Sequence, residues 1–380
     1  MSRVILGDVA NERRETCKGS KDGYPIVGLE HLTPGEITLT AWDEGKENTF
    51  SKSFRKGDIL FGRRRAYLKK AAVAPFDGIC SGDITVIKAQ PKRILPELLP
   101  FIIQNDALFE FAVGKSAGSL SPRVKWENLK NYEIELPDME KQRELAKILW
   151  AIDKTRKTYQ KLMQKTDELV KSRFIEMFGD PVTNPMGWEV KPLGDVFKII
   201  DGDRGEHYPK GTDFYKVGYC AFLNTGNVTI NGFEFSNVHF ITEDKDKQLR
   251  KGRFERHDIV VTTRGTVGNI ALYTQNVPYE VMRINSGMVL LREYSKIINP
   301  EYFIFLVRVF SIFRPYLSGS AQPQLPITNM KKIPIQIPQL DLQNRFADFV
   351  RQVDKSKFEL KKALADLEAT CKRIISENLG

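Results

Sequence analysis

Apolar residues recur at intervals of three, four and seven positions through two long, otherwise polar segments of the chain. In the second segment they are Phe346, Phe349, Val353, Leu360, Leu364, Leu367, Cys371 and Ile374. In the first segment, with some drift, they are Leu145, Ile148, Ile152, Tyr159, Leu162, Leu169, Phe174 and Phe178. Such spacing over four or more heptads predicts helices with a coiled-coil seam. About 40 residues at a rise of 1.5 Å make each helix on the order of 60 Å long.

The segments that precede these helices have a different pattern. Short β-rich runs lie at 58–61, 84–87, 258–263 and 288–291, separated by glycine and polar turns. An apolar helical stretch follows late in each segment, at 98–113 and 302–316. Because strands come first and helices later, we expect α+β domains with a twisted sheet, and not a chain of βαβ units.

The chain also repeats itself. Pro137 and Pro338 lie 201 positions apart, and each is followed by polar residues and a glutamine, as expected where a helix begins. This register continues to Gly179 and Gly380, the last residue. Leu-Gly-Asp-Val occurs at 6–9 and again at 193–196, which are 187 positions apart, so the front parts differ by insertions. Two copies of one module are expected to bind a target that itself has two parts.

Glycine and proline mark the boundaries of the modules. Gly179 suits the end of the first helix, and Pro181 and Pro185 prevent its continuation. The expected organisation is a recognition domain at 1–137, a long helix at 138–180, a linker with a second domain at 181–338, and a second long helix at 339–380. Two tandem modules can bury both apolar seams by pairing their helices antiparallel, with pseudo-twofold symmetry and one globular domain at each end of a rod.

Composition narrows the functional class only slightly. The 380 residues are 41% hydrophobic, with no apolar run of membrane-spanning length and no N-terminal apolar region of a signal peptide, so a cytoplasmic location is expected. The net charge of +10 permits nucleic-acid binding. The net charge is +3 for residues 1–137, +2 for 138–180, +4 for 181–338 and +1 for 339–380. This excess is too mild to distinguish a DNA-binding protein from another basic protein. The four cysteines and four histidines lack metal-binding spacings, so we expect reduced thiols and no metal site.

Two pairs of equivalent turns carry the candidate DNA-binding residues. The first pair follows the strands at 58–61 and 258–261, and the second consists of the small-residue loops 114–123 and 317–324. Arginine, asparagine and glutamine there suit contacts to base edges, and lysine suits phosphates. A solvated basic cluster and plain flexible loops are the alternatives. The candidates, together with Arg204, are Arg63, Arg64, Arg65, Lys69, Lys70, Lys115, Ser119, Arg123, Arg264, Thr266, Asn269, Gln322 and Gln324.

Catalytic motifs are missing from the sequence. There is no phosphate-binding GxxxxGK[ST] loop and no helicase box. Residues 184–188, Asn-Pro-Met-Gly-Trp, differ from the Asn-Pro-Pro-aromatic motif of amino-methyltransferases, and no glycine-rich AdoMet loop precedes them. We therefore expect a protein without catalytic activity of its own.

The whole chain closely resembles the specificity subunit of type I restriction-modification enzymes. The resemblance rests on the Leu-Pro and Ile-Pro entries into the helices, on residues 178–195, and on the strand-turn blocks at 57–65 and 257–268. It implies two target recognition domains, each binding one half of a bipartite, asymmetric site on double-stranded DNA. One departure is the N-terminus, which lacks a counterpart of residues 184–188. The first domain is therefore expected to use the end of the C-terminal helix to complete its fold.

The resemblance also implies partners. Two modification (methyltransferase) subunits would dock on the helices and carry AdoMet, and restriction subunits would add ATP- and Mg-dependent translocation. This chain itself would bind no cofactor and would not contact a membrane. Candidate docking residues on the helices are Gln142, Leu145, Leu162, Gln343, Phe346 and Leu364.

Three other functions remain open at this point. The chain could be the specificity module of a different methyltransferase or nuclease assembly. It could be a protein-binding scaffold whose coiled coils dimerise it. A self-sufficient methyltransferase is disfavoured because the sequence has no AdoMet motif.

Overall fold

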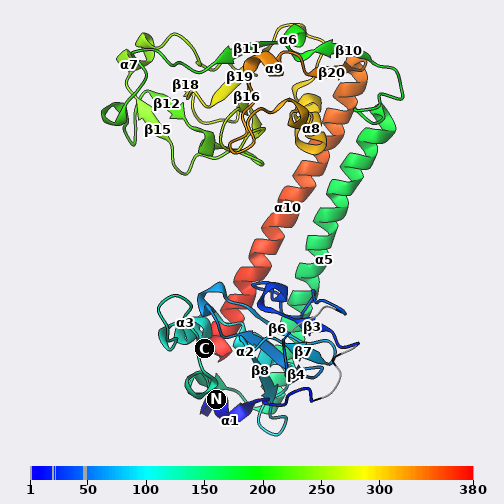
Figure 1. Ribbon diagram of the computed structural model, residues 1–380, viewed down its shortest axis with the longest axis vertical. Helices are drawn as coiled ribbons and strands as arrows, with labels where there is room; N and C mark the ends of the chain where they lie inside the picture. Colours follow the sequence, from blue (N-terminus) through cyan, green and yellow to red (C-terminus); the bar gives the residue numbers. More distant parts are fainter. Residues whose placement is uncertain (1, 19–20, 22, 46–48, 380) are drawn as a thin grey trace. The chain divides into compact units, whose positions relative to one another are not determined.

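The computed structural model describes residues 2–18, 21, 23–45 and 49–379, so Gly380 lies outside the described part. The chain divides into two units: unit 1 comprises Met1–Met163 and Phe358–Gly380, and unit 2 comprises Gln164–Lys357. Helix α5 (Met139–Phe178) begins in unit 1 and ends in unit 2, and α10 (Leu340–Leu379) runs from unit 2 into unit 1 (Figure 1). Both helices have 40 residues and lie within two residues of the ranges expected from the sequence.

Unit 1 contains an antiparallel sheet in the order β2-β8-β5-β6, a smaller sheet β3-β7-β4, and the pair β1-β9. The strands are β1 Ser2–Ile5, β2 Ala10–Glu12, β3 Ile26–Val27, β4 Lys52–Phe54, β5 Ile59–Gly62, β6 Ala71–Val73, β7 Gly78–Cys80, β8 Ile84–Ala89 and β9 Glu133–Leu136. The helices are α1 Leu6–Val9, η1 Leu29–His31, η2 Ala66–Leu68, α2 Leu99–Ile103, α3 Asp106–Gly114 and α4 Trp126–Leu129.

Unit 2 repeats the main antiparallel sheet as β11-β19-β16-β17 and the pair as β10-β20, but its smaller sheet has the order β15-β12-β18 and it adds the pair β13-β14. Its strands are β10 Glu189–Pro192, β11 Phe197–Asp201, β12 Cys220–Leu223, β13 Val228–Thr229, β14 Gly232–Phe233, β15 His239–Ile241, β16 Ile259–Thr262, β17 Ile270–Leu272, β18 Met282–Ile284, β19 Met288–Glu293 and β20 Pro334–Ile337. Its helices are α6 Leu193–Val196, η3 Gly211–Asp213, η4 Thr225–Asn227, α7 Glu243–Gln248, α8 Pro300–Phe310, η5 Arg314–Tyr316 and α9 Ile327–Met330.

The apolar helical stretches are each shorter than the sequence pattern predicts. The stretch 98–113 is divided into α2 and α3, because Asn105 adopts an extended conformation and its side chain caps α3 by accepting from Ala107 N. The stretch 302–316 ends as α8 at Phe310, where Ser311 adopts a left-handed conformation with φ +51°. A residue in that conformation commonly ends a helix, and η5 follows after it.

The repeated Leu-Gly-Asp-Val forms the same one-turn helix in both units, α1 and α6. Gly7 N donates to Lys130 O, and Gly194 N donates to Lys331 O, at 2.8 and 3.1 Å. A Cβ on either glycine would lie 3.2 Å from the Cβ of that lysine, so glycine permits the close approach of the two backbones. The motif is thus repeated because it anchors the start of each unit to the segment that leads into the long helix.

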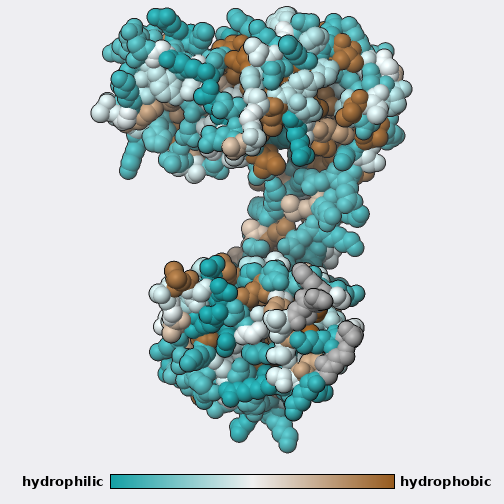
Figure 2. All heavy atoms as spheres, viewed as in Figure 1, coloured by the Kyte–Doolittle hydropathy of each residue, from teal (hydrophilic) through white to brown (hydrophobic). Residues whose placement is uncertain are grey.

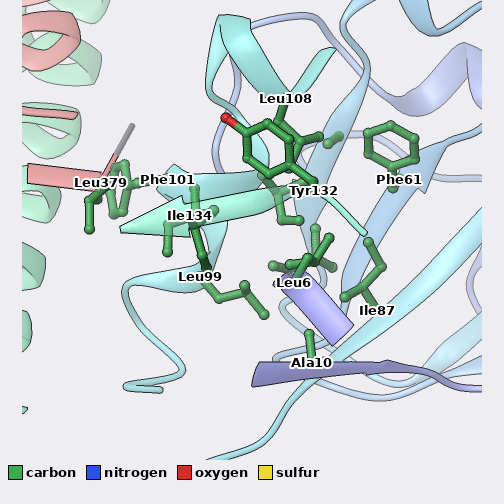
Figure 3. Packing of buried hydrophobic residues seen from close by; sticks show 14 of the residues in the cluster. Leu6, Ala10, Phe61, Ile87, Leu99, Phe101, Leu108, Tyr132, Ile134 and Leu379 are labelled. Atoms are coloured by element: carbon green, nitrogen blue, oxygen red, sulfur yellow. The ribbon is translucent and has the colours of Figure 1, made fainter. Parts of the chain in front are cut away.

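The end of each long helix completes the core of the unit into which it runs. In unit 1, Ile375 and Leu379 of α10 belong to the cluster that contains Leu6, Phe101 and Ile134 (Figure 3). The first domain therefore does use the C-terminal helix end, as the sequence suggested. In unit 2 the equivalent positions on α5, 201 residues earlier, are Phe174 and Phe178, which are both fully buried.

Within each unit the two helices are antiparallel, since the beginning of one lies beside the end of the other. In unit 1, Ile152 and Arg156 of α5 line one groove together with Cys371 of α10, and in unit 2 Lys357 of α10 forms an ion pair with Asp167 of α5. The apolar stripe is covered unevenly: Leu162, Leu169 and Phe358 are 48%, 55% and 65% exposed. These three side chains therefore add apolar area to the surface of the helices.

Within the described residues no helix combines the length and apolar character needed to span a bilayer. The faces of both units seen in Figure 2 are mainly hydrophilic, with hydrophobic side chains in small groups.

Two glutamines fasten the first turn of each long helix to its own unit. Gln142 accepts from Leu95 N at 2.8 Å and donates to Pro137 O at 2.9 Å. Gln343 accepts from Asn299 N at 2.8 Å and donates to two carbonyls, those of Ile297 and Pro338.

Four of the candidate docking residues are taken up by these internal contacts. Gln142, Leu145, Gln343 and Phe346 are at most 3% exposed, because the first turns of α5 and α10 face the cores of their own units. They pack the protein internally and have no surface to offer a partner. Leu162 is exposed and Leu364 is half-buried, so these two remain candidates.

We expect Gln343→Leu to lower the free energy of unfolding by about 2–4 kcal/mol, because it leaves a buried N–H and two carbonyls without their partner. Gln352→Leu, at an exposed position of the same helix, should change it by less than about 0.5 kcal/mol. Urea unfolding of the full chain measures both, and equal midpoints for the two variants would contradict the fastening role of Gln343.

Candidate nucleic-acid interface

In each unit the end of a main-sheet strand lies beside the small-residue loop. In unit 1, Val124 N donates to Arg63 O at 3.0 Å, and in unit 2, Leu325 N donates to Thr263 O at 3.0 Å. Each loop is closed by mutual backbone hydrogen bonds, between 117 and 123 in one and between 318 and 324 in the other. We call this surface the tip of a unit. It comprises residues 62–70 with 114–124 in unit 1, and 263–269 with 317–325 in unit 2.

At the tip of unit 1, two candidate arginines meet on one carboxylate that sequence reasoning missed. Arg123 Nε donates to Asp83 Oδ1 at 2.7 Å, and Arg64 Nη1 lies 3.3 Å from Asp83 Oδ2. Arg64 Nε also donates to Ser121 Oγ at 2.9 Å. The Arg123 guanidinium lowers the pKa of Asp83 below its ordinary value, which partial burial alone would raise. Asp83 is therefore ionised at neutral pH. Nothing in its sequence context marks it, because 40 residues separate it from Arg123.

The other basic residues after strand β5 differ in their availability. Arg65 is exposed and adopts a left-handed conformation with φ +53°. Lys69 Nζ is 2.6 Å from Asp106 Oδ1, and this contact lowers the pKa of Asp106. Lys70 Nζ donates to Leu29 O at 2.6 Å. Both lysines are thus engaged within unit 1, so they are weaker candidates for phosphate contacts than their charge suggested.

Arg63 and the small-residue loop complete the tip of unit 1. Arg63 is half-buried, and its Nε has no hydrogen-bond partner among the described residues. Lys115 and Ser119 are exposed, and Lys115 Nζ lies 5.7 Å from the centre of the Phe111 ring. Leu120 at the end of the loop is 92% exposed.

The tip of unit 2 has the same strand-end and loop hydrogen bonds as that of unit 1, but a shorter turn without a counterpart of η2 and different side chains. Arg264, which corresponds to Arg64, is exposed, and no side-chain hydrogen bond or ion pair involves it within the part of the chain that the structure describes. Thr263 N donates to Gly287 O just as Arg63 N donates to Asp83 O, so Gly287 occupies the place of Asp83. A Cβ at Gly287 would lie 2.9 Å from Thr225 Cγ2, so this position has no room for a side chain as packed here.

The remaining candidates of unit 2 lie in this tip or beside it. Arg204 is exposed and donates to Ser286 O at 3.2 Å, next to Gly287. Thr266, Gln322 and Gln324 are exposed.

Asn269 has a structural role at the edge of this tip. It is half-buried, and its side chain donates to Val228 O at 2.8 Å, which ties the β16-β17 turn to β13. We therefore assign Asn269 to the architecture of the tip and the exposed side chains to contact with a ligand.

One cluster in unit 1 has the composition of a metal site but not its hydrogen bonding. Glu30, His31 and Asp43 are the only group of three such residues that the described ranges bring together. Nδ1 of His31 accepts from Gly28 N at 2.9 Å, so in the neutral ring Nε2 carries the proton and faces Asp43 at 3.6 Å. Neither ring nitrogen has a free lone pair, which disfavours metal binding.

A second pair of equivalent surfaces lies where the long helices meet the rest of each unit. Unit 1 has a groove of about 380 Å³ and unit 2 a groove of about 740 Å³. Six pairs of positions in the 201-residue register line both. They are Ile152 and Val353, Asp153 and Asp354, Arg156 and Lys357, Asp167 and Glu368, Val170 and Cys371, and Lys171 and Lys372. Both grooves combine an apolar floor with acidic and basic side chains.

Comparison with known proteins agrees with this architecture. Residues 4–166 and 185–369 match the family of type I restriction modification DNA specificity domains. The MjaIX specificity subunit of a type I restriction enzyme from Methanocaldococcus jannaschii is 24% identical over 373 residues, which cover 91% of this chain and 84% of that protein.

Two solved structures share the fold. A chain of a type I restriction-modification system has a TM-score of 0.61 at 20% identity, with 99% of this chain and 97% of that chain covered. The S subunit of a type I restriction-modification system from M. genitalium has a TM-score of 0.59 at 13% identity, with 100% and 96% covered. Each of the two matched stretches of sequence contains one of the tips, and the chain belongs to the family of type I restriction-modification specificity subunits.

Proposed function

We propose that this chain reads a bipartite, asymmetric site on double-stranded DNA, one half with each tip, and has no catalytic activity of its own. The observation that carries the proposal is the pair of tips with equivalent strand-end and loop hydrogen bonds and two sets of side chains. Arg64, Asp83 and Arg123 in unit 1 correspond to Arg264, Gly287 and Gln324 in unit 2. Different donors and acceptors on the same framework suit two different half-sites, because base edges are distinguished by their hydrogen-bonding pattern.

The two grooves support docking of two copies of one partner, which we identify as the modification subunit. Six register-related pairs give both grooves similar chemistry, so a protein that fits one is expected to fit the other. The exposed Leu162, Leu169 and Phe358 add apolar surface on the same helices. AdoMet would be carried by this partner, and ATP and Mg by restriction subunits that join the complex. A specificity module of another methyltransferase or nuclease assembly would have the same tips and grooves.

Methylation mapping tests the proposal directly. The chain is co-expressed with its modification subunit, and methylated adenines are mapped on random-sequence DNA. A two-part, non-palindromic site separated by unspecified bases is expected. Methylation at a continuous sequence, or none that depends on this chain, would argue against two readers. A DNA reader is expected to bind duplex DNA with an affinity that falls steeply as the salt concentration rises. A protein scaffold would show no such binding.

Arg264→Ala should weaken binding to the cognate site about tenfold or more, since one good base contact is worth about 1–3 kcal/mol. It should leave stability unchanged, because the side chain is exposed. Asn269→Ala should instead lower the free energy of unfolding by about 1–2 kcal/mol through the loss of its bond to Val228 O.

Equilibrium binding to labelled duplexes and thermal unfolding separate these two effects. Arg345→Ala, which removes a charge from the exposed side of α10, is the control and should reduce affinity far less than Arg264→Ala. Equal losses for Arg264→Ala and Arg345→Ala would mean that Arg264 contributes only general charge.

We further propose that the long helices set the number of bases between the half-sites. Seven residues inserted after Met163 and seven after Lys357, the last residues before the boundary between the units in each helix, add about 10 Å to both helices. The unspecified gap should then grow by about three base pairs, at 3.4 Å each. Methylation mapping should show both half-sites unchanged, and altered half-site sequences with a constant gap would contradict the helical ruler.

A further inference from the structure

We propose that Asp83 determines the specificity of unit 1 by holding Arg64 and Arg123 in one fixed arrangement at the tip. The inference rests on the proposed function, that the tips read DNA, and adds a residue that acts through the two arginines. Asp83 is a positioning residue in this proposal.

The backbone around Asp83 is itself fixed. Asp83 directly precedes strand β8, its N–H donates to Ser81 Oγ at 3.2 Å, and its carbonyl accepts from Arg63 N at 3.0 Å. Its side chain therefore starts from a defined place between the strand end and the small-residue loop. With 19% of that side chain exposed, the carboxylate is partly shielded from solvent, which strengthens its attraction for the two cations.

These contacts restrain the two arginines but leave several of their N–H donors unused. A guanidinium has five N–H donors. Arg64 uses Nε on Ser121 Oγ and one donor on Asp83, and Arg123 uses Nε and Nη2 on Asp83. Each keeps three donors, and the two side chains are 38% and 44% exposed. Restrained donors of this kind suit bidentate contact to guanine O6 and N7, which requires a defined direction.

The negative charge has a second consequence. A carboxylate among the arginines reduces their attraction for phosphates, which carry no sequence information, while leaving directed hydrogen bonds to bases possible. Unit 2 lacks this device, because Gly287 stands in the place of Asp83 and Arg264 is unrestrained by any side-chain partner among the described residues. The two tips should therefore respond differently to the loss of a carboxylate.

Asp83→Ala is tested in the full chain co-expressed with its modification subunit, on duplexes randomised at every position of both half-sites. The base preference at one or two positions of one half-site should fall about tenfold, while affinity for unrelated duplex DNA rises severalfold and its salt dependence steepens. The half-site affected by Arg264→Ala should keep its preferences. Asp77→Ala, an exposed carboxylate of unit 1 outside the tip, is the matched control and should leave every preference unchanged.

The possible outcomes separate the inference from the function on which it rests. Absence of any sequence preference in the unaltered chain would overturn the proposed function. A bipartite preference that Asp83→Ala leaves intact at every position would overturn the role of Asp83 alone. Ser121→Ala releases Arg64 from its other restraint without touching the carboxylate, and should weaken preference in the same half-site. If Asp83→Ala does not fold, Ser121→Ala still tests the inference. An unchanged base preference in Ser121→Ala would then count against it.

Discussion

Both units depend on the packing of a long-helix end into a core made mostly by a distant part of the chain. Phe178, fully buried in unit 2, contacts Tyr302 and Phe346 with ring centres 4.9 and 5.5 Å apart. Ile375 and Leu379 close the core of unit 1. Unit 1 is therefore built from two separate segments of the chain, whereas unit 2 is the continuous segment Gln164–Lys357, which opens with the end of α5 and closes with the first part of α10. Folding of each therefore requires both long helices, which couples the readers to the element that joins them.

Each unit neutralises an equivalent buried aspartate, but with an arginine from a different place in its sheet. A buried aspartate opens the strand before each tip: Asp58 accepts from Arg55 N and pairs with Arg13, and Asp258 accepts from Glu255 N and pairs with Arg292. The aspartate and the turn it holds are equivalent, but the arginine comes from a different part of each sheet. A buried charge needs a partner, though not one from a particular position. This freedom allows the sequences to diverge while the strand continues to deliver its end to the tip.

Sequence reasoning recovered the architecture because periodicity and repetition are local signals. The helices found at 139–178 and 340–379 and the repeated Leu-Gly-Asp-Val turn followed from them, whereas the family followed from the resemblance of particular motifs. It could not decide which polar side chains are free. Lys69 faces Asp106, and Gln142 turns into its own unit. Asp83 escaped notice for the same reason, since its importance arises from contacts with residues 19 and 40 positions away.

The spacing between equivalent positions of the two repeats changes only where the structure accepts inserted residues. Equivalent positions are 187 residues apart at Gly7, 200 at Arg63, 204 at Asp83 and then 201 from Ala117 to the end of the helices. Every insertion or deletion thus falls before the last loop of the tip. One residue inserted into a packed helix would rotate all following side chains by about 100° and destroy both seam and groove, whereas a longer surface loop costs little. Divergence in length is therefore confined to the parts of each unit that precede the last loop of its tip, and the surfaces that we propose bind the partner remain equivalent.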